Sequence, residues 1–197
     1  MRILAFADLH TKCIDKIKNT DFSKFNYDVC FTLGDIDCQH LRAITECVNC
    51  DTFGVLGNHD EYGMLERFGI IGLDEKEIII NNISVTGLSG SSRYKLDDKP
   101  MLTQKESINL SKHLPPAEIL VSHDSVYGLY GAKSDEAHCG LKGISRYIRK
   151  HKPIINLHGH HHENSVKQCK KTKDICIFGC SVVEVDKNGL VDIVYIF

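Results

Sequence analysis

The sequence has no long hydrophobic run and no strong charge of either sign. No stretch approaches the roughly 18 consecutive apolar residues that span a bilayer, and 24 basic against 26 acidic side chains leave a net charge of −2. This balance gives no general attraction to nucleic acid or to anionic membranes. Asp8 and His10 interrupt the first apolar residues too soon for a signal peptide. These absences predict a soluble, cytoplasmic protein with no membrane partner.

The sequence also lacks the cysteine pattern of a disulfide framework. Its nine cysteines are odd in number and scattered along the chain, which favours a reducing compartment. Cys47 and Cys50 have the C-x-x-C spacing of redox or zinc sites, but no second pair matches them. Because they fall near the end of an expected helix, we interpret them as packing residues.

No internal repeat, linker or low-complexity segment divides the 197 residues, so we expect one domain over 1–197 with no separate cap. Early apolar runs alternate with helical spacing, which predicts parallel βαβ units, and later runs predict antiparallel additions. Strands are expected at 3–7, 27–33, 53–56, 77–80, 83–87, 118–122, 154–157, 175–178, 181–185 and 190–196, helices at 41–48, 103–113 and 141–150, and a loop at 89–100. The fold class is therefore α/β.

Ionisable residues follow five of the apolar runs. They are Asp8-Leu9-His10, Gly34-Asp35, Gly57-Asn58-His59-Asp60, His123 and Gly159-His160-His161-His162. Sites in open α/β sheets form beyond the carboxyl ends of the strands. Any one group is also an ordinary turn sequence, but turn chemistry alone explains five of them poorly. The pattern predicts one shared site.

The residue types in these groups indicate a metal site. Carboxylate and amide oxygens together with imidazoles suit divalent Mn²⁺, Fe²⁺ or Zn²⁺. The ligands are too many for one open catalytic ion and enough for two, which could share a bridging carboxylate and a bridging hydroxide and clamp a phosphoryl group. No cysteine stands at these strand ends, which disfavours a structural thiolate zinc site.

The five groups resemble the motif series of the calcineurin-like metallophosphoesterase superfamily: D-x-H, G-D, G-N-H-D/E, an isolated H and G-H-x-H. All five occur here in the same order between Asp8 and His162. The resemblance implies a four-layer fold, in which a mixed β-sandwich is flanked by helices. It also implies a hydrolase that acts on phosphoesters with two divalent metal ions.

The resemblance also implies a role for each residue. The first metal would be held by Asp8, His10 and His162, the second by Asn58, His123 and His160, and Asp35 would bridge both. His59 would protonate the leaving oxygen, a step that gains from a positioned acid, and Asp60 would orient its ring. The interposed His161 is expected to point away from the metals, and His158 to pack or hydrogen-bond on the opposite face.

A finer likeness covers 121–164 and resembles small phosphodiesterase-type members. It suggests Arg93, with its planar donors, and His138 as tentative substrate contacts; an exposed loop arginine is an equal alternative for Arg93. The G-D motif departs from the usual family extension, because Asp37 lies one position early and Cys38 takes its place. This departure concerns residues around the ligands rather than Asp35 itself.

We expect the substrate to be a small phosphoester, with a phosphodiester favoured over a monoester. A nuclease is an alternative, because basic stretches at 142–152 and 167–173 could track phosphates, but such charges are more often a solvated helix face and the net charge opposes this reading. A non-catalytic, partner-binding scaffold of the same fold is a further alternative. The completeness of the site, His59 included, favours an enzyme. The sequence leaves the substrate, the metals and the oligomeric state open.

Overall fold

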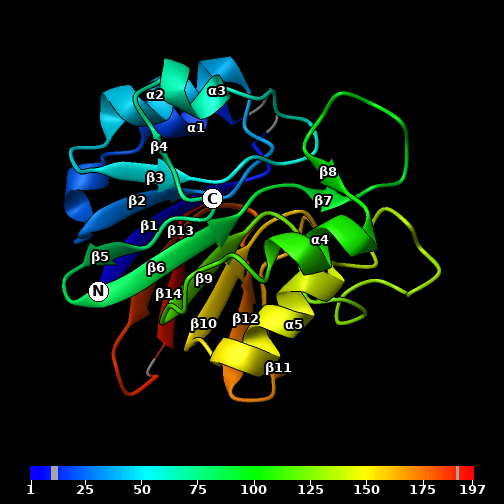
Figure 1. Cartoon of the computed structure of the whole chain (residues 1–197). Helices are drawn as coiled ribbons and strands as arrows, with labels where there is room; N and C mark the ends of the chain where they lie inside the picture. Colours follow the sequence, from blue (N-terminus) through cyan, green and yellow to red (C-terminus); the bar gives the residue numbers. More distant parts are fainter. Residues whose placement is uncertain (10–12, 190) are drawn as a thin grey trace.

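The computed structural model describes residues 1–9, 13–189 and 191–197, and two mixed β-sheets form its centre (Figure 1). The first sheet has the order β14-β13-β1-β2-β3-β4, formed by Val191–Tyr195, Gly179–Val185, Arg2–Ala7, Val29–Thr32, Thr52–Gly54 and Ile71–Gly72. The second has the order β11-β12-β10-β9-β6-β5, formed by Ser165–Cys169, Thr172–Cys176, Ile155–His158, Ile119–Ser122, Ile83–Leu88 and Ile78–Ile80. Two short strands, β7 (Ser91–Ser92) and β8 (Met101–Leu102), pair separately.

Parallel pairing dominates the middle of both sheets. In the first sheet β1, β2, β3 and β4 run parallel, β13 pairs antiparallel with β1, and β14 pairs antiparallel with β13. In the second sheet β6, β9, β10 and β12 run parallel, and β5 and β11 add antiparallel edges. The predicted βαβ units and antiparallel additions are therefore confirmed.

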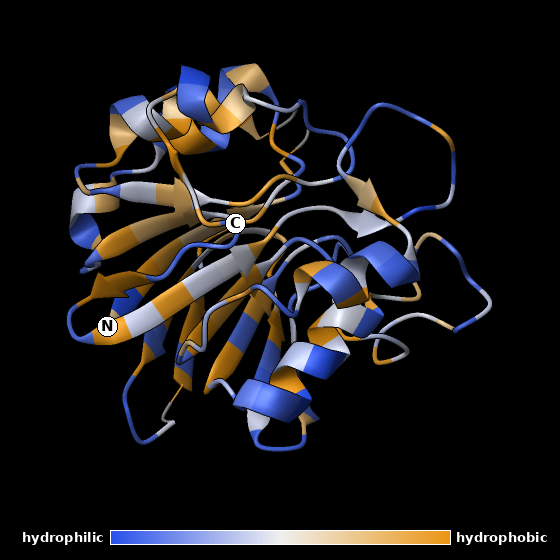
Figure 2. Cartoon of the chain, in the orientation of Figure 1, coloured by the Kyte–Doolittle hydropathy of each residue, from blue (hydrophilic) through white to orange (hydrophobic). Residues whose placement is uncertain are grey.

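Alternating side chains place one hydrophobic core between the sheets. On β1, Ile3, Ala5 and Ala7 point into it, whereas Leu4 and Phe6 point to the outer face. Strands carry alternate side chains to opposite faces, so a sheet that is buried on both faces reads as a continuous apolar run. Figure 2 shows this concentration of hydrophobic residues on the strands.

Helices cover the outer face of each sheet. The first sheet packs against α1 (Ile14–Asn19), the short 3-10 helix η1 (Phe22–Lys24), α2 (Cys38–Cys47) and α3 (Met64–Arg67). The second packs against α4 (Gln104–Leu110) and α5 (Lys142–His151), whose Tyr147 is buried and donates to the Pro115 carbonyl at 2.7 Å. The result is the expected four-layer arrangement, helices–sheet–sheet–helices, of α/β class.

Most expected elements are present, with instructive differences. Asn81 and Asn82 both have positive φ (49° and 61°), as a tight hairpin turn requires. The helix expected over 103–113 begins on a capping box of Thr103 and Glu106 but ends at Leu110. The loop expected over 89–100 contains β7, and the basic stretch at 167–173 belongs to the β11–β12 hairpin rather than to a helix face.

The helices and cysteines add two observations. In the described ranges, no helix is both long and apolar enough to cross a membrane. All nine cysteines lie in those ranges and none forms a disulfide. Cys47 ends α2 and is exposed. Cys50 packs against the hydrophobic residues that lie between the first sheet and its covering helices.

Candidate metal centre

The predicted ligands within the described residues follow β1, β2, β3, β9 and β10, and four of them have unusual backbone geometry. Asp8, Asp35, His160 and His162 all have positive φ, at 53°, 54°, 73° and 50°. This conformation costs a non-glycine residue roughly 1–2 kcal/mol and is concentrated at functional sites. The fold therefore holds these four side chains in directions that relaxed turns would not give.

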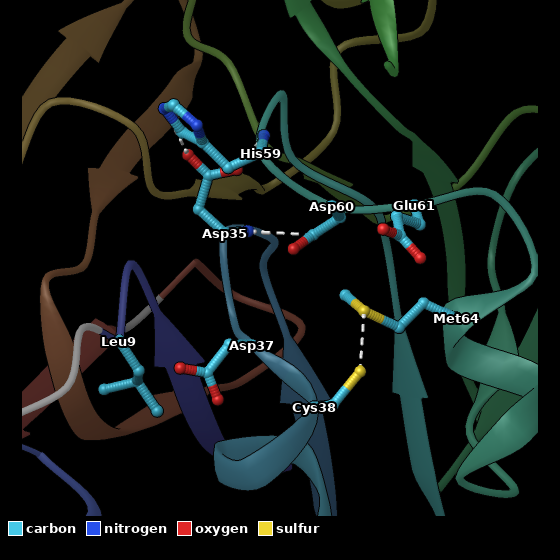
Figure 3. A pocket seen from close by; sticks show the side chains of 8 residues that line it. All are labelled: Leu9, Asp35, Asp37, Cys38, His59, Asp60, Glu61 and Met64. Atoms are coloured by element: carbon cyan, nitrogen blue, oxygen red, sulfur yellow. Dashed lines mark hydrogen bonds and ion pairs between the residues drawn. The ribbon is translucent and has the colours of Figure 1, made fainter. Parts of the chain in front are cut away.

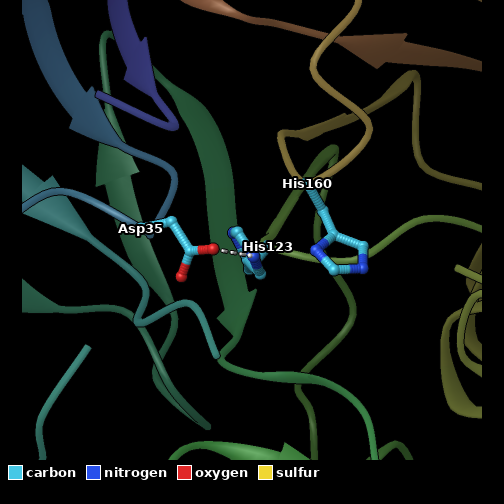
Figure 4. Close-up of side chains that lie close together, drawn as sticks. All are labelled: Asp35, His123 and His160. Carbon is cyan, nitrogen blue, oxygen red and sulfur yellow. Dashed lines mark ion pairs between the residues drawn. The ribbon is translucent and has the colours of Figure 1, made fainter. Parts of the chain in front are cut away.

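Three of the predicted ligands converge from both sheets. Asp35 follows β2, His123 follows β9 and His160 follows β10, and each offers a ligand atom within 4.8 Å of the other two (Figure 4). All three residues are buried. A carboxylate and two imidazoles at this separation form a plausible ligand set for one divalent ion.

Hydrogen bonding fixes the His123 ring for such a role. Its Nδ1 lies 2.8 Å from the Leu33 carbonyl oxygen, which can only accept, so Nδ1 carries the proton. In the neutral ring the lone pair is then on Nε2, which lies 3.2 Å from Asn58 Oδ1 and 3.4 Å from Asp35 Oδ2. Both oxygens are acceptors, so a positive group at Nε2, either a second ring proton or a metal ion, would satisfy this arrangement.

The charges in this cluster are consistent with that need. Burial is the largest single influence and opposes protonation of His123, but the Asp35 and Asp8 carboxylates and the Leu33 carbonyl together raise the His123 pKa to about 10. Burial likewise opposes ionisation of Asp35, yet the His123 ring and the His59 backbone N–H, which donates to Oδ1 at 2.8 Å, hold the Asp35 pKa below its usual range. The site thus favours positive charge beside an ionised carboxylate.

His160 is held in the same manner as His123. Its Nε2 lies 2.8 Å from the Ala137 carbonyl, which leaves Nδ1 with the lone pair. Burial is the largest cause of its lowered pKa, so the ring is neutral near pH 7. A neutral ring whose other nitrogen donates to a carbonyl is the form in which histidine binds metals.

Asp8 and His162 form a second group beside the first. The Asp8 Oδ2 accepts the backbone N–H of His160 at 2.8 Å, while its buried Oδ1 has no hydrogen-bond partner among the described residues and lies 3.8 Å from His162 Nε2. Burial is the main cause that raises the Asp8 pKa to about 7. A buried carboxylate oxygen of this kind, facing an imidazole, fits a metal ligand. The other predicted ligand of this group, His10, lies outside the described residues.

Two glycines allow the ligands to approach one another. A Cβ on Gly159 would lie 2.6 Å from Asp8 Oδ2, and a Cβ on Gly34 would lie 2.6 Å from His123 Nδ1. Contacts this short do not occur in proteins, so a side chain at either position would displace a ligand.

His59 stands at the mouth of the site. Its side chain is 64% exposed, and its Nε2 lies 4.0 Å from Asp35 Oδ2. The ring can therefore reach both solvent and a group bound at Asp35, as a proton donor must.

The Asp60 carboxylate bonds to the backbone of two turns. Its Oδ2 accepts the backbone N–H group of Asp35 at 2.9 Å (Figure 3) and that of Gly57 at 2.7 Å, and its Oδ1 accepts that of Ile36 at 3.1 Å. These bonds occupy the carboxylate with backbone groups rather than with the His59 ring. The carboxylate therefore fastens the turn that carries Asp35 to the turn after β3, and the role of orienting the His59 ring stays a prediction.

A cavity of about 510 Å³ opens beside His59 and Asp35 (Figure 3). Asp37 and Glu61 contribute acidic groups, and the remaining walls include the apolar side chains Leu9, Cys38 and Met64. Asp37 caps α2, where its carboxylate accepts the Gln39 and His40 backbone N–H groups. The cavity is large enough for part of a small substrate.

The two tentative substrate contacts differ in position. The Arg93 guanidinium pairs with Glu106 at 3.2 Å and donates to the Met101 carbonyl at 2.9 Å, and it lines another cavity of about 270 Å³. These two partners, from α4 and β8, are not predicted metal ligands, and the role of Arg93 as a substrate contact stays a prediction. The half-exposed His138 does border the site, with its ring centre 5.2 Å from that of His160.

His161 and His158 turn away from the ligands, as expected. His161 bonds Ser125 Oγ at 2.9 Å and stacks on Tyr130 at 4.9 Å, and burial lowers its pKa to about 2. His158 is buried and bonds Asp174 at 3.1 Å. Both rings belong to a polar network behind the metal ligands.

Several supporting groups were not found from the sequence. The carbonyls of Leu33 and Ala137, which orient His123 and His160, carry no sequence signal because every residue has a carbonyl. Asp124 is different: it directly follows His123 and accepts the Ser92 backbone N–H at 2.9 Å. An acidic residue next to a predicted ligand was a signal that could have been used.

Comparisons with known proteins agree with this geometry. The profile of the calcineurin-like phosphoesterase superfamily domain matches residues 1–180. No curated protein sequence matches. Similar solved structures include TT1561 of Thermus thermophilus (12% identity, 100% of this chain and 99% of that chain, TM-score 0.73), a phosphopantetheinyl hydrolase from Mycobacterium tuberculosis (11%, 90% and 89%, 0.67) and an archaeal phosphodiesterase (12%, 98% and 99%, 0.58).

These structural likenesses show the fold, which is that of the superfamily's mixed, helix-flanked sheets. The match of the profile covers nearly the whole chain and includes every ligand position from Asp8 to His162. The chain belongs to the calcineurin-like phosphoesterase superfamily.

Proposed function

We propose that the protein is a metal-dependent phosphodiesterase that uses two divalent ions. The observation that carries the proposal is the convergence of Asp35, His123 and His160 from two sheets, with Asp8 and His162 beside them. Asp35 would bridge the ions, His123, His160 and Asn58 would hold one, and Asp8, His162 and His10 the other. Mn²⁺, Fe²⁺ and Zn²⁺ all suit these ligands.

The ions would lower the pKa of water and neutralise charge on the phosphoryl oxygens. The chain's own residues hold the geometry: the Leu33 and Ala137 carbonyls fix the ring orientation of His123 and His160, and Asp60 fixes the turn of Asp35. Positioning of this kind is a large part of phosphoryl-transfer catalysis.

His59 is the proposed general acid. Its exposed ring lies beside Asp35 at the opening of the 510 Å³ cavity, so the leaving oxygen of a bound phosphoester would lie within its reach. A poor leaving group gains most from such a donor. The cavity's apolar wall at Leu9, Cys38 and Met64 would contact the leaving group.

The expectations of one domain without a separate cap and of a cytoplasmic location stay predictions. The proposed substrate is a small phosphodiester. The structural neighbours named a phosphodiesterase and a phosphopantetheinyl hydrolase support this substrate class. Cleavage of nucleic acid is not favoured: the basic segment 167–173 forms the edge hairpin β11–β12, which leads away from the ligand-bearing end of β10.

The test is hydrolysis of bis(p-nitrophenyl) phosphate with added Mn²⁺ by the wild type, Asp35→Asn and His59→Gln. We expect activity that depends on the metal, near-complete loss in Asp35→Asn and a partial loss in His59→Gln. A phosphomonoester assayed in parallel decides between diester and monoester preference. Equal, metal-independent rates in all three proteins would favour the non-catalytic scaffold and reject the proposed enzyme.

A further inference from the structure

A second cavity, of about 280 Å³, is surrounded by lysines. We name it the lysine cavity; its walls are Lys152, Pro153, Ile154, Gln168, Lys171, Lys173, Lys187, Asn188 and Gly189. The four lysines come from three parts of the chain: the end of α5, the β11–β12 hairpin and the β13–β14 turn. Such convergence differs from a solvated helix face, where charges are spread along one element.

The walls are held by specific contacts. Lys173 is half-buried and donates to the Gly189 carbonyl at 3.0 Å, which ties β12 to the β13–β14 turn. A Cβ on Gly189 would lie 3.8 Å from the Ile154 side chain, so that turn also packs against the segment before β10. Lys152 has φ of 54° at the end of α5, a conformation in which glycine or asparagine is usual. These contacts hold the walls of the lysine cavity in place.

Among the described residues of its walls, the lysine cavity has positive charges and no negative group that balances them. No acidic residue lines it, and in the described part of the chain none of its four ammonium groups forms an ion pair with a carboxylate. The Asp186 carboxylate, next along the chain, accepts the Asn188 backbone N–H at 2.8 Å and so bonds within the turn. Like charges around one small space repel, and an anion with several charges would relieve the repulsion.

The lysine cavity is separate from the metal centre. Lys152 and Ile154 precede β10, whereas His158 and His160 lie at its other end. At about 3.3 Å per residue, the four residues of β10 alone separate the two sites by roughly 13 Å. A small phosphoester bound at the metals would not reach these lysines.

We propose that the lysine cavity binds a small, multiply charged phosphate anion. This site is additional to the proposed phosphodiesterase site and does not depend on it. The three exposed lysines would contact the phosphate oxygens, and the fixed Lys173 would supply positive charge at the base. Phosphate fits these walls because ammonium groups donate to its oxygens from several directions.

The experiment follows backbone amide NMR signals of the full-length, metal-loaded protein during titration with pyrophosphate. We expect saturable shifts at Gly189 and Ile154. In Lys171→Gln/Lys187→Gln the binding constant should fall by about tenfold or more, because two charge-assisted contacts are lost. The matched control, Lys105→Gln/Lys112→Gln in and just after α4, removes the same charge from exposed positions elsewhere and should bind as the wild type does.

The signals also separate this site from the catalytic one. Pyrophosphate bound only at the metals would shift the amides of Asp35 and His160 and leave Gly189 unchanged, which would overturn the proposal. Equal weakening in both double variants would also overturn it, since that result indicates a general charge effect. Sedimentation with phosphatidylcholine vesicles that contain phosphatidylinositol phosphate tests whether the bound phosphate belongs to a lipid headgroup or to a free anion. Binding of the vesicles or of pyrophosphate that is lost in Lys171→Gln/Lys187→Gln supports the phosphate site.

Discussion

Asp8 shows how a single ligand position can oppose stability in the metal-free protein. Its carboxylate is fully buried, and Oδ1 has no hydrogen-bond partner among the described residues. The pKa rises from 3.8 to about 7, chiefly through burial. A folded-state pKa above the unfolded value means that stability present at low pH is lost as the pH rises toward 7. The metal-free protein therefore carries a penalty at neutral pH that a bound cation would remove.

We expect Asp8→Asn to raise the melting temperature of the metal-free protein at pH 8. Asparagine keeps an oxygen for the His160 N–H but has no charge to bury, and the penalty removed is on the order of 1.4 kcal/mol per pKa unit. The gain should be small near pH 4, grow up to about pH 7 and stay constant above it. Thermal melts across this range check the prediction, and a constant difference at all pH values would contradict it.

We expect His59→Gln to affect substrates unequally. A p-nitrophenolate leaves readily without a proton, whereas an alkoxide needs one, so the loss should be small for bis(p-nitrophenyl) phosphate and about 10²–10⁴-fold for an alkyl diester such as glycerophosphocholine. Rates measured by ³¹P NMR and absorbance give the comparison. His113→Gln, at another exposed histidine, is the control. Equal losses on both substrates would assign His59 to binding rather than to proton donation.

At the scale of elements, the sequence predicted strands better than it predicted short helices. Buried strands such as β1 and β9 are continuous apolar runs, which the pattern identifies directly. The helices α1 and α3 are too short to establish a helical period, and β11 is a polar edge strand with few apolar residues. Tertiary contacts rather than local pattern determine these elements.

The candidate site was predicted from strand ends for a related reason. Parallel strands bring their carboxyl ends to one edge of a sheet. Motifs that follow such strands are therefore expected to lie close together, as Asp35, His123 and His160 do. The same logic could not place Arg93, because its position depends on β8 and on the Glu106 carboxylate of α4. Nor could it assign Asp60, whose three backbone partners come from two different turns.

The turn after β10 depends on close contact with β1. Gly159 does not have a positive φ, but a Cβ there would lie 2.6 Å from Asp8 Oδ2 and 2.9 Å from the Ala7 Cβ. We expect Gly159→Ala to lower the free energy of unfolding by about 1–3 kcal/mol, as overpacked sites do, and to weaken metal binding at least tenfold. Urea unfolding and metal titration measure the two effects.

Gly72→Ala is the matched control for this turn. Gly72 also lies in an extended segment without positive φ, and its added Cβ would meet only Glu66 Oε1 at 3.9 Å among the described residues. Its effect should stay within about 0.5 kcal/mol, with metal affinity unchanged. If both variants lost metal affinity alike, close approach at Gly159 could not be the cause.

At the scale of the whole molecule, the metal centre joins the two sheets. Asp8, Asp35 and Asn58 extend from the first sheet, and His123 and His160 extend from the second. Away from this edge the sheets are held together by apolar packing. A cation bound across the gap would add a direct connection between the two halves of the sandwich, and its removal should act on both.

We therefore expect metal removal to lower the stability of the entire fold. An ion present at 100 times its dissociation constant stabilises the folded state by about 2.7 kcal/mol, which for a chain of this size corresponds to roughly 5–10 °C in melting temperature. Calorimetry with and without EDTA measures the difference. Asp35→Asn in the first sheet and His160→Asn in the second should each abolish the metal-dependent part. If one variant kept it, the ion would be held by a single sheet, and the connection across the sandwich would be excluded.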